Sequence, residues 1–502
     1  MNHHTPNDNK DMNIGSTVKT ALAAMVAMAA TVSCTEVPTD EVLSHSRPKT
    51  WPDIAGVTIP ARVAPLNFNV EDADKVYVMI SGEKGGSISA GGEWADIDID
   101  EWHDLTERNR GADLTFTIST KKSGRWTRHE DIKVHVSEDN LNDYGLTYRK
   151  IAPGYETYSD IGLYQRDIHS FHEEPIIAST LVPGQCMCCH TANRANPDQL
   201  TLHLRGSHAA TLVMTDGQRK WLTTKTDSTL CNCMYPYWHP SGNYCAYSLN
   251  KVAQGFMTGS DKFIEVFDKA SDACVMDVRT NELILSPALQ TADNETYPVF
   301  SADGGKIFYC TAKPKRIPAE AQELRYDLCA VGFDAKDGII GNRADTVLKV
   351  SDQGGSISLP RPSYDGRFIM FCKTDYGYFP IDHREADLWV LDLRSGESHP
   401  ATEANSADTE SFHNWSSDSR WVVFSSRRHD GMTSLAYIAH VDTLGNVSKP
   451  FLLPQRNPKK FHLHSLHSFN TPDFTTKRVN LPPRETYNEV FADTREQVTI
   501  RM

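Results

Sequence analysis

Five consecutive residues of this 502-residue chain have types and a spacing that could do chemistry: Cys186-Met187-Cys188-Cys189-His190. Read as Cys-x-x-Cys-His, they have the spacing by which two thiols form thioether bonds to haem vinyl groups while the following histidine binds the iron. The sequence therefore predicts one covalent haem c, with Cys186 and Cys189 as thioether residues and His190 as an axial iron ligand. The alternative is a local disulfide, or buried thiols beside a surface histidine. Cys188 is a third thiol that could compete for haem attachment or form the disulfide.

The iron of such a haem needs a ligand on its opposite side, where an imidazole or a thioether would set the reduction potential. His203 is the first candidate for this second axial ligand because it lies close to the motif in sequence. His208, His239 and Met214 are the alternatives. For each of these four residues taken alone, a surface or turn position without a haem role is the competing interpretation.

The N-terminus bears on the compartment in which this chemistry would occur. Lys19 precedes an apolar run of small residues over 20–32, which is the pattern of a signal peptide. The run ends in Thr31-Val32-Ser33-Cys34, which resembles a lipobox, the site at which a cysteine is lipidated and becomes the mature N-terminus. We therefore expect residues 1–34 to be a lipoprotein signal peptide that ends at a lipidated Cys34; an ordinary secretory signal is the alternative. Both predict export, and lipidation predicts a periplasmic or cell-surface lipoprotein of the outer membrane.

Composition excludes some classes of partner. Asp and Glu number 65 against 51 Lys and Arg, which gives a net charge of -14 without any basic cluster. Nucleic-acid binding is not expected, because it requires a positive face to neutralise phosphates. Beyond the signal segment no apolar run is long enough to span a membrane, so the lipid anchor is the expected membrane attachment.

The remaining cysteines read mainly as core thiols. Five of them are assigned to buried positions: Cys245, Cys274, Cys310, Cys329 and Cys372. The first, third and fifth of these stand inside short apolar runs in which a small buried hydrophobe fits as well as a reactive thiol. Cys231 and Cys233 could pair with a distant thiol or bind a metal, but Cys-x-Cys alone is weak evidence for a site.

Alternating apolar and polar residues dominate the chain after the signal. Residues 35–50 read as a polar tether, and 51–145 as a β-sandwich-like domain with strands such as Val76–Ile80 and Leu114–Ile118. Glu101–Leu105 reads as one short helical turn within it.

The segment 146–200 is predicted to carry the motif. Four apolar residues fall on one face of a helix over 157–172, which ends before Pro175: Ile161, Tyr164, Ile168 and Phe171. The Cys-x-x-Cys-His motif then follows on a loop. Simple core packing of the apolar stripe is the alternative to direct haem contact.

Residues 201–502 contain an internal repeat. Pro236-Tyr237-Trp238-His239-Pro240-Ser241-Gly242 recurs from Pro298, again from Pro360, and in degenerate form from His413, at spacings of 62, 62 and 53 residues. Each copy is followed by an apolar strand. Several strands per repeat are typical of a β-propeller blade. We expect an all-β chain in which this region forms five to seven blades with closure by the C-terminus.

The turn Pro-x-Trp-x-x-Asp-Gly before a strand resembles the repeat of the TolB-like, or PD40, propellers. More narrowly, Val57–Pro60 with Ala64–Phe68, Cys186–His190, Tyr235–Asn250 and Phe451–Gln455 resemble an uncharacterised group of exported bacterial PD40 lipoproteins that carry a c-type haem motif. The resemblance covers roughly residues 51–475. It implies a propeller fold and export, and it also favours His203, whose surroundings are similar in that group; the residue matching Cys188 is typically asparagine there.

Two further groups of residues could form sites. His462 and His464 would share one face of a strand, as a metal-binding pair does, although an edge strand without a metal is the alternative. The charged segments Ser425–Gly431 and Asp382–Glu385 could line a propeller mouth and bind a polar ligand, or be solvated turns. No nucleophile elbow, phosphate loop or paired-carboxylate signature is present, so a hydrolase is supported only by analogy with other propellers.

Two functions therefore remain open. The first is a membrane-anchored electron carrier, or a redox-linked module, with one haem c and a redox or envelope protein as partner. The second is a haem-free propeller scaffold that binds a protein or ligand in the cell envelope.

Overall fold

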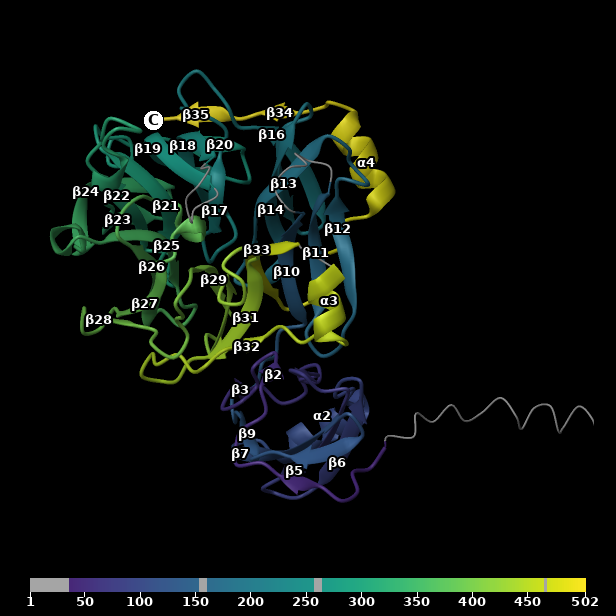
Figure 1. The fold of residues 1–502 in the computed structure, drawn as a ribbon. Helices are drawn as coiled ribbons and strands as arrows, with labels where there is room; N and C mark the ends of the chain where they lie inside the picture. Colours follow the sequence, from purple (N-terminus) through teal and green to yellow (C-terminus); the bar gives the residue numbers. More distant parts are fainter. Residues whose placement is uncertain (1–35, 153–159, 257–263, 465–466) are drawn as a thin grey trace, which may run out of the picture. The chain divides into compact units, whose positions relative to one another are not determined.

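The computed structural model describes residues 36–152, 160–256, 264–464 and 467–502 (Figure 1). The predicted signal peptide, with the lipidation candidate Cys34, lies outside these residues. Among the helices of the described segments, none combines the length and the apolar character needed to cross a membrane.

The N-terminal part is β-rich, as predicted, but it is built on one large sheet. Its seven strands are β1 (Val42–Leu43), β3 (Thr58–Ile59), β5 (Lys75–Gly82), β6 (Ser87–Gly92), β7 (Ala112–Lys122), β8 (Arg125–Arg128) and β9 (Ile132–Val136). A separate pair is formed by β2 (Thr50–Trp51) and β4 (Asn69–Val70). The stretch predicted as a tether thus already contributes β1, which pairs in parallel with β8.

A helix packs against this sheet where only one helical turn was expected. Helix α2 runs over Ile99–Arg108, and the carboxylate of its N-cap, Asp98, accepts hydrogen bonds from two backbone N–H groups of the first turn. Trp102 is fully buried, with its ring centroid 6.2 Å from that of Phe116 on β7. A single sheet covered by a helix therefore takes the place of two stacked sheets.

The rest of the described chain is a six-bladed β-propeller (Figure 1). Each blade is a sheet of four antiparallel strands, which are named from the inside of the ring outwards. Blade 1 contains β33 (Ser468–Thr475), β10 (Gly145–Ile151), β11 (Ile161–Asp167) and β12 (Glu173–Ala178). Blade 2 contains β13 (Gln185–Asn193), β14 (Asn196–Gly206), β15 (Ala210–Thr215) and β16 (Gln218–Thr223). Blade 3 contains β17 (Met234–Trp238), β18 (Tyr244–Phe256), β19 (Ile264–Asp277) and β20 (Glu282–Ile284).

The other three blades have the same arrangement. Blade 4 contains β21 (Asn294–Phe300), β22 (Lys306–Ala312), β23 (Asp327–Asp334) and β24 (Ile339–Leu348). Blade 5 contains β25 (Ser356–Pro362), β26 (Phe368–Thr374), β27 (Asp387–Asp392) and β28 (Ser398–Pro400). Blade 6 contains β29 (Glu410–Trp415), β30 (Trp421–Ser426), β31 (Leu435–His440) and β32 (Phe451–Leu452). Three single-turn 3-10 helices lie in loops: η1 (Ala321–Glu323), η2 (Ser351–Gln353) and η3 (Pro380–Asp382).

The six inner strands form a closed ring, because β13, β17, β21, β25, β29 and β33 contact one another in succession and β33 contacts β13. The C-terminal part closes this ring, as predicted. After helix α3 (Pro458–His464) it supplies β33 to blade 1. After helix α4 (Pro483–Phe491) it adds β34 (Glu496–Gln497) and β35 (Thr499–Arg501) in parallel to the outer strands of blades 2 and 3.

The sequence predicted two elements of the segment 146–200 wrongly. The expected helix over 157–172 contains β11, and the expected haem-motif loop is β13. Both faces of β11 are covered, since Ile161 and Leu163 are buried on one face and Arg166 on the other, so strict polar alternation is lost. The helical spacing of its apolar residues was therefore coincidental, and the propeller begins at Gly145 rather than at residue 201.

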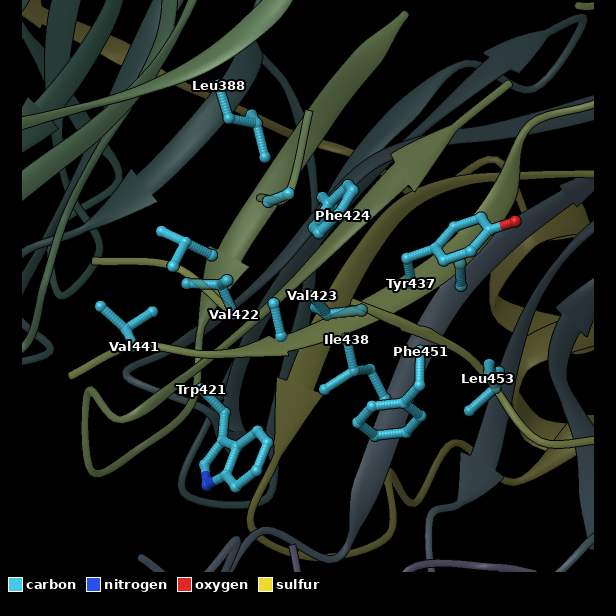
Figure 2. Close-up of a cluster of buried hydrophobic side chains, with 14 of the residues drawn as sticks. Leu388, Trp421, Val422, Val423, Phe424, Tyr437, Ile438, Val441, Phe451 and Leu453 are labelled. Atoms are coloured by element: carbon cyan, nitrogen blue, oxygen red, sulfur yellow. The ribbon is translucent and has the colours of Figure 1, made fainter. Parts of the chain in front are cut away.

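The same burial on both faces holds blade 6 together. All six residues of β30 are buried, among them Trp421, Val422, Val423 and Phe424. Figure 2 shows these side chains with Tyr437 and Ile438 of β31 in one apolar cluster.

Candidate functional site

All six inner strands share one irregularity, and the Cys-x-x-Cys-His motif lies on it. In every blade two residues of the inner strand oppose a single residue of the second strand, which is a β-bulge. The first bulge residue has a left-handed φ between 47° and 52° in each case: Cys189, Tyr235, Tyr297, Leu359, Phe412 and Thr471. The second bulge residues are His190, Pro236, Pro298, Pro360, His413 and Pro472. Cys189-His190 is therefore the blade 2 copy of a dipeptide that every blade contains.

The motif is buried in the wall of the propeller. Cys186, Cys188 and His190 are 3%, 6% and 7% exposed. Cys186 is paired across the sheet with Arg205, and Cys188 with His203, both on β14. The Cys188 thiol donates to the His203 carbonyl at 3.4 Å. All ten cysteines of the described residues are free thiols, including those assigned to the core, of which Cys245, Cys274, Cys310 and Cys372 are fully buried.

Two arginines approach these thiols from the neighbouring strands. Arg149 of β10 donates to the Cys186 sulfur at 3.0 Å, and Arg205 donates to the Met234 sulfur at 3.1 Å. The adjacent Cys188 side chain is the main cause that lowers the pKa of Cys189, and Arg205 lowers it further, although burial opposes both effects. The guanidinium groups therefore face sulfur atoms rather than carboxylates.

His190 contacts the preceding blade. Its Nε2 lies 3.1 Å from the Thr147 hydroxyl of β10. Burial, with a smaller contribution from Arg149, lowers the pKa of His190 to about 3. The imidazole is thus neutral and hydrogen-bonded inside the protein.

The four candidates for a second iron ligand lie at different places. His203 stands next to the motif, but its Nδ1 is hydrogen-bonded to the Thr211 hydroxyl at 3.0 Å, and burial lowers its pKa to about 4. The other three are elsewhere. His208 pairs with Asp493 at 2.6 Å, His239 contacts Ser241 and the Gly304 carbonyl in a turn, and Met214 is buried on β15.

The folded strand does not fit a haem. Both thiols and the imidazole would have to lie on one open surface beside the macrocycle, whereas Cys186 and His190 are packed against β10. Two cavities in the propeller have room for about one water molecule each, about 10 Å³. Across the described segments, no group of three or more His, Cys, Asp or Glu side chains is arranged to hold a metal ion.

Aromatic side chains lie between the blades at the level of the bulges. The ring centroids of Tyr235 and Tyr297 are 4.7 Å apart, and Tyr378 stacks on Tyr297 at 5.8 Å. Phe379 and Phe412 continue the cluster with a centroid distance of 5.9 Å. Tyr378 of this cluster also lines one of the two cavities, whereas the other cavity lies where the inner strands end.

The first cavity lies near the charged loops that the sequence singled out. It is lined in part by Glu265, whose carboxylate is 3.1 Å from His383. Arg427 is paired with Asp382, so the two predicted segments do meet. By contrast, the expected edge strand with His462 and His464 is the helix α3, so the spacing of a strand face does not apply to that pair.

The second cavity, which we call the turn mouth, lies where the inner strands run into the tight turns between the first two strands of the blades. Its lining comes from Thr191, Ala192, Arg194, Tyr237, Trp238, Tyr364 and Asn414. Sequence reasoning missed these residues, together with Asp473 and Arg361 beside them. Extending the repeat one copy backwards from Pro236, with His190 aligned as His413 is, would have placed Thr191 and Arg194 at this mouth.

Comparison with protein-family models gives no match, and neither does comparison with curated proteins. Among solved structures, TolB from Acinetobacter baumannii is 12% identical, with 76% of this chain and 86% of that chain covered and a TM-score of 0.44. A putative TolB from Agrobacterium tumefaciens is 13% identical over 66% and 98% of the two chains, with a TM-score of 0.37. Kuenenia stuttgartiensis hydrazine synthase is 9% identical over 68% and 50%, with a TM-score of 0.42. These likenesses concern the fold alone, and the six-bladed architecture rests on the pairing of the strands.

Proposed function

We propose that this chain is an exported β-propeller that acts as a binding scaffold in the cell envelope. In this proposal Cys34 carries the lipid anchor, and the propeller binds a protein or small ligand of the periplasm or cell surface. The Cys-x-x-Cys-His sequence then serves as the inner strand of blade 2. No nucleic acid is expected as a partner, because the acidic chain has no basic cluster to neutralise phosphates.

One observation carries the proposal. His190 takes the place that proline takes in four of the other five blades, and it is buried with its Nε2 next to Thr147. Because the same bulge recurs in every blade, the repeat alone accounts for the position of His190, and no cofactor is needed to explain it.

Covalent haem with a role in electron transfer is the second candidate. The spacing of Cys186, Cys189 and His190 behind an export signal favours it, as do Arg149 and Arg205, since guanidinium groups pair well with carboxylates such as haem propionates. This candidate requires the inner strand of blade 2 to leave its sheet.

Expression with the native signal in a host that matures c-type cytochromes separates the two. We expect no haem staining that survives denaturation, with a known cytochrome c from the same cells as the positive control. A covalently attached haem that is lost in a Cys186→Ser and Cys189→Ser double variant would establish the second candidate instead.

A further inference from the structure

Arg194 reaches across the turn mouth. It lies in the turn between β13 and β14 of blade 2, and its Nη2 donates to the backbone carbonyl of Tyr364 at 2.5 Å. Its guanidinium carbon is 5.4 Å from the centroid of the Tyr364 ring. Tyr364 follows β25 of blade 5, which is opposite blade 2 in a ring of six. The arginine therefore bridges two blades on opposite sides of the ring.

The turn that presents Arg194 is strained. Asn193 pairs with Asn196, so the hairpin loop has only two residues, and both have left-handed backbones: Arg194 with φ 49° and Ala195 with φ 63°. Asn-Gly is the dipeptide that such a turn favours. Two side-chain-bearing residues in this conformation persist only where surrounding contacts hold them, and they cluster at binding sites.

A buried carboxyl group lies behind two residues that line the turn mouth. Asp473 of β33 is 2% exposed. Its Oδ2 accepts long hydrogen bonds from the Thr191 hydroxyl at 3.3 Å and the Ala192 N–H at 3.4 Å, both residues that line the cavity. Its Oδ1 is buried and has no hydrogen-bond partner within the described segments. A buried oxygen of this kind is costly unless a donor reaches it.

The neighbouring charge does not fully compensate Asp473. Arg361 donates its Nε to the Asn414 side chain at 3.0 Å, and its guanidinium carbon lies 5.5 Å from the Tyr237 ring centroid. It lowers the pKa of Asp473, yet burial outweighs this effect and raises that pKa to about 7. The carboxylate form is thus short of a positive partner.

We propose that the turn mouth binds a positively charged side chain of a partner protein, a guanidinium or an ammonium group, and that Arg194 occupies this place in the free protein. The inference rests on the proposed scaffold function and names the site and the chemistry of its partner. The guanidinium of Arg194 contacts a carbonyl oxygen and the face of a tyrosine ring, and the Asp473 carboxyl group is bonded to Thr191 and Ala192 of the same cavity lining; all of these groups attract cations. The net charge of -14 attracts a basic partner at long range.

Titration calorimetry with N-acetyl-argininamide on the purified mature chain tests this, with N-acetyl-glutaminamide and N-acetyl-glutamate amide as neutral and acidic controls. Arg194→Ala should bind the arginine probe about tenfold more tightly than the wild type, because the site is no longer self-occupied. Arg194→Lys, which keeps a cation in place, should remain close to the wild type. In the Arg194→Ala background, Asp473→Asn should weaken binding about tenfold, and Tyr364→Leu about fivefold.

Two outcomes would overturn the inference. One is that Arg194→Ala leaves the affinity for the arginine probe unchanged or lowers it. The other is that the wild type binds the acidic probe and Arg194→Ala abolishes this, which would make the turn mouth an anion site. Thermal unfolding of each variant shows whether it is folded, and Tyr364→Leu keeps the test decisive if Asp473→Asn unfolds the chain. The haem content of the protein does not enter the measurement, so failure here is distinguishable from failure of the proposed function.

Discussion

His190 and His413 hold the same position in two different blades, and the Nε2 atom of each forms a hydrogen bond to the preceding blade. His190 Nε2 is 3.1 Å from the Thr147 hydroxyl, and His413 Nε2 donates to the Met370 carbonyl at 2.9 Å. Thr147 and Met370 both lie on the second strand of the preceding blade, each opposite the residue that follows a bulge. The histidine of the haem motif thus has a structural equivalent that belongs to no motif.

This equivalence predicts that proline can replace His190. Four other blades have proline there, so the bulge already suits its fixed φ and needs no N–H at that residue. We expect His190→Pro to fold and to lower Tm by about 1–2 °C, which corresponds to one lost hydrogen bond in a chain of this length. Circular dichroism melting measures this. Leu202→Pro, on the second strand opposite the bulge, is the control and should not fold, because it removes a hydrogen bond from the middle of a sheet.

The two histidines also predict acid sensitivity. Burial is the main cause that lowers the pKa of both His190 and His413 to about 3, from about 6.5 in the unfolded chain. A depressed pKa contributes stability above pH 6.5 that is lost as the pH falls from 6.5 towards 3. At pH 5 the loss is about 2 kcal/mol for each histidine.

Denaturant unfolding at pH 7 and pH 5 tests this with the double variant His190→Pro and His413→Pro. The decrease in unfolding free energy between the two pH values should be about 4 kcal/mol smaller than in the wild type. An equal decrease in both proteins would mean that the two imidazoles are reached by solvent in the folded state.

Asp473 has the opposite dependence on pH. Burial raises its pKa to about 7, and a raised carboxyl pKa contributes stability at low pH that is lost as the pH rises. Between pH 5 and pH 8 the loss is about 3 kcal/mol. Asp473→Asn should therefore stabilise the protein at pH 8 and flatten its Tm between these values. Burial also raises the pKa of Asp143, to about 6, so the variant should still lose some stability as the pH rises, but less than the wild type. The exposed Asp198→Asn is the control for the change in charge.

The C-terminal strands predict a graded response to truncation. Deleting residues 494–502 removes β34 and β35, which only cover the outer edges of blades 2 and 3, so the chain should fold with a lower Tm. Deleting 468–502 also removes β33, the inner strand of blade 1, and the ring cannot close. We expect this shorter chain to be degraded or aggregated. Limited proteolysis distinguishes the two, and a folded product from the shorter chain would contradict the assignment of β33.

The sequence predicts the propeller because blades 3 to 6 repeat the same turn and strand. It misses blade 1 because its inner strand β33 begins at Ser468, 290 residues after the last of the other three strands ends at Ala178. It misses the inner strand of blade 2 because His190 replaces proline, and because the turn Arg194-Ala195 has no glycine, whereas the turns of blades 3, 4 and 5 contain Gly242, Gly304 and Gly366. Extending the repeat would have placed Arg194 among the turns, but its contact with Tyr364 could not be predicted, because blades 2 and 5 face each other only when the ring closes. The spacing of Cys186–His190 therefore predicted a haem site, whereas aligning His190 with the bulge residues of the other blades identifies the same segment as an inner strand.

The chemical state of the three motif cysteines distinguishes the haem-free scaffold from the protein with a covalent haem. In the folded state Cys186 and Cys188 are buried, so they should react with iodoacetamide far more slowly than a free thiol in solution. After denaturation without a reductant, the proteolytic peptide that contains residues 186–190 should carry three carbamidomethyl groups, because all three cysteines are free. Cys372, which is fully buried in blade 5 beside His413, is the internal control for complete unfolding. A peptide with one alkylated cysteine and the added mass of a haem would place thioether bonds on the other two, and one with a single alkylated cysteine and a loss of two hydrogens would reveal a disulfide.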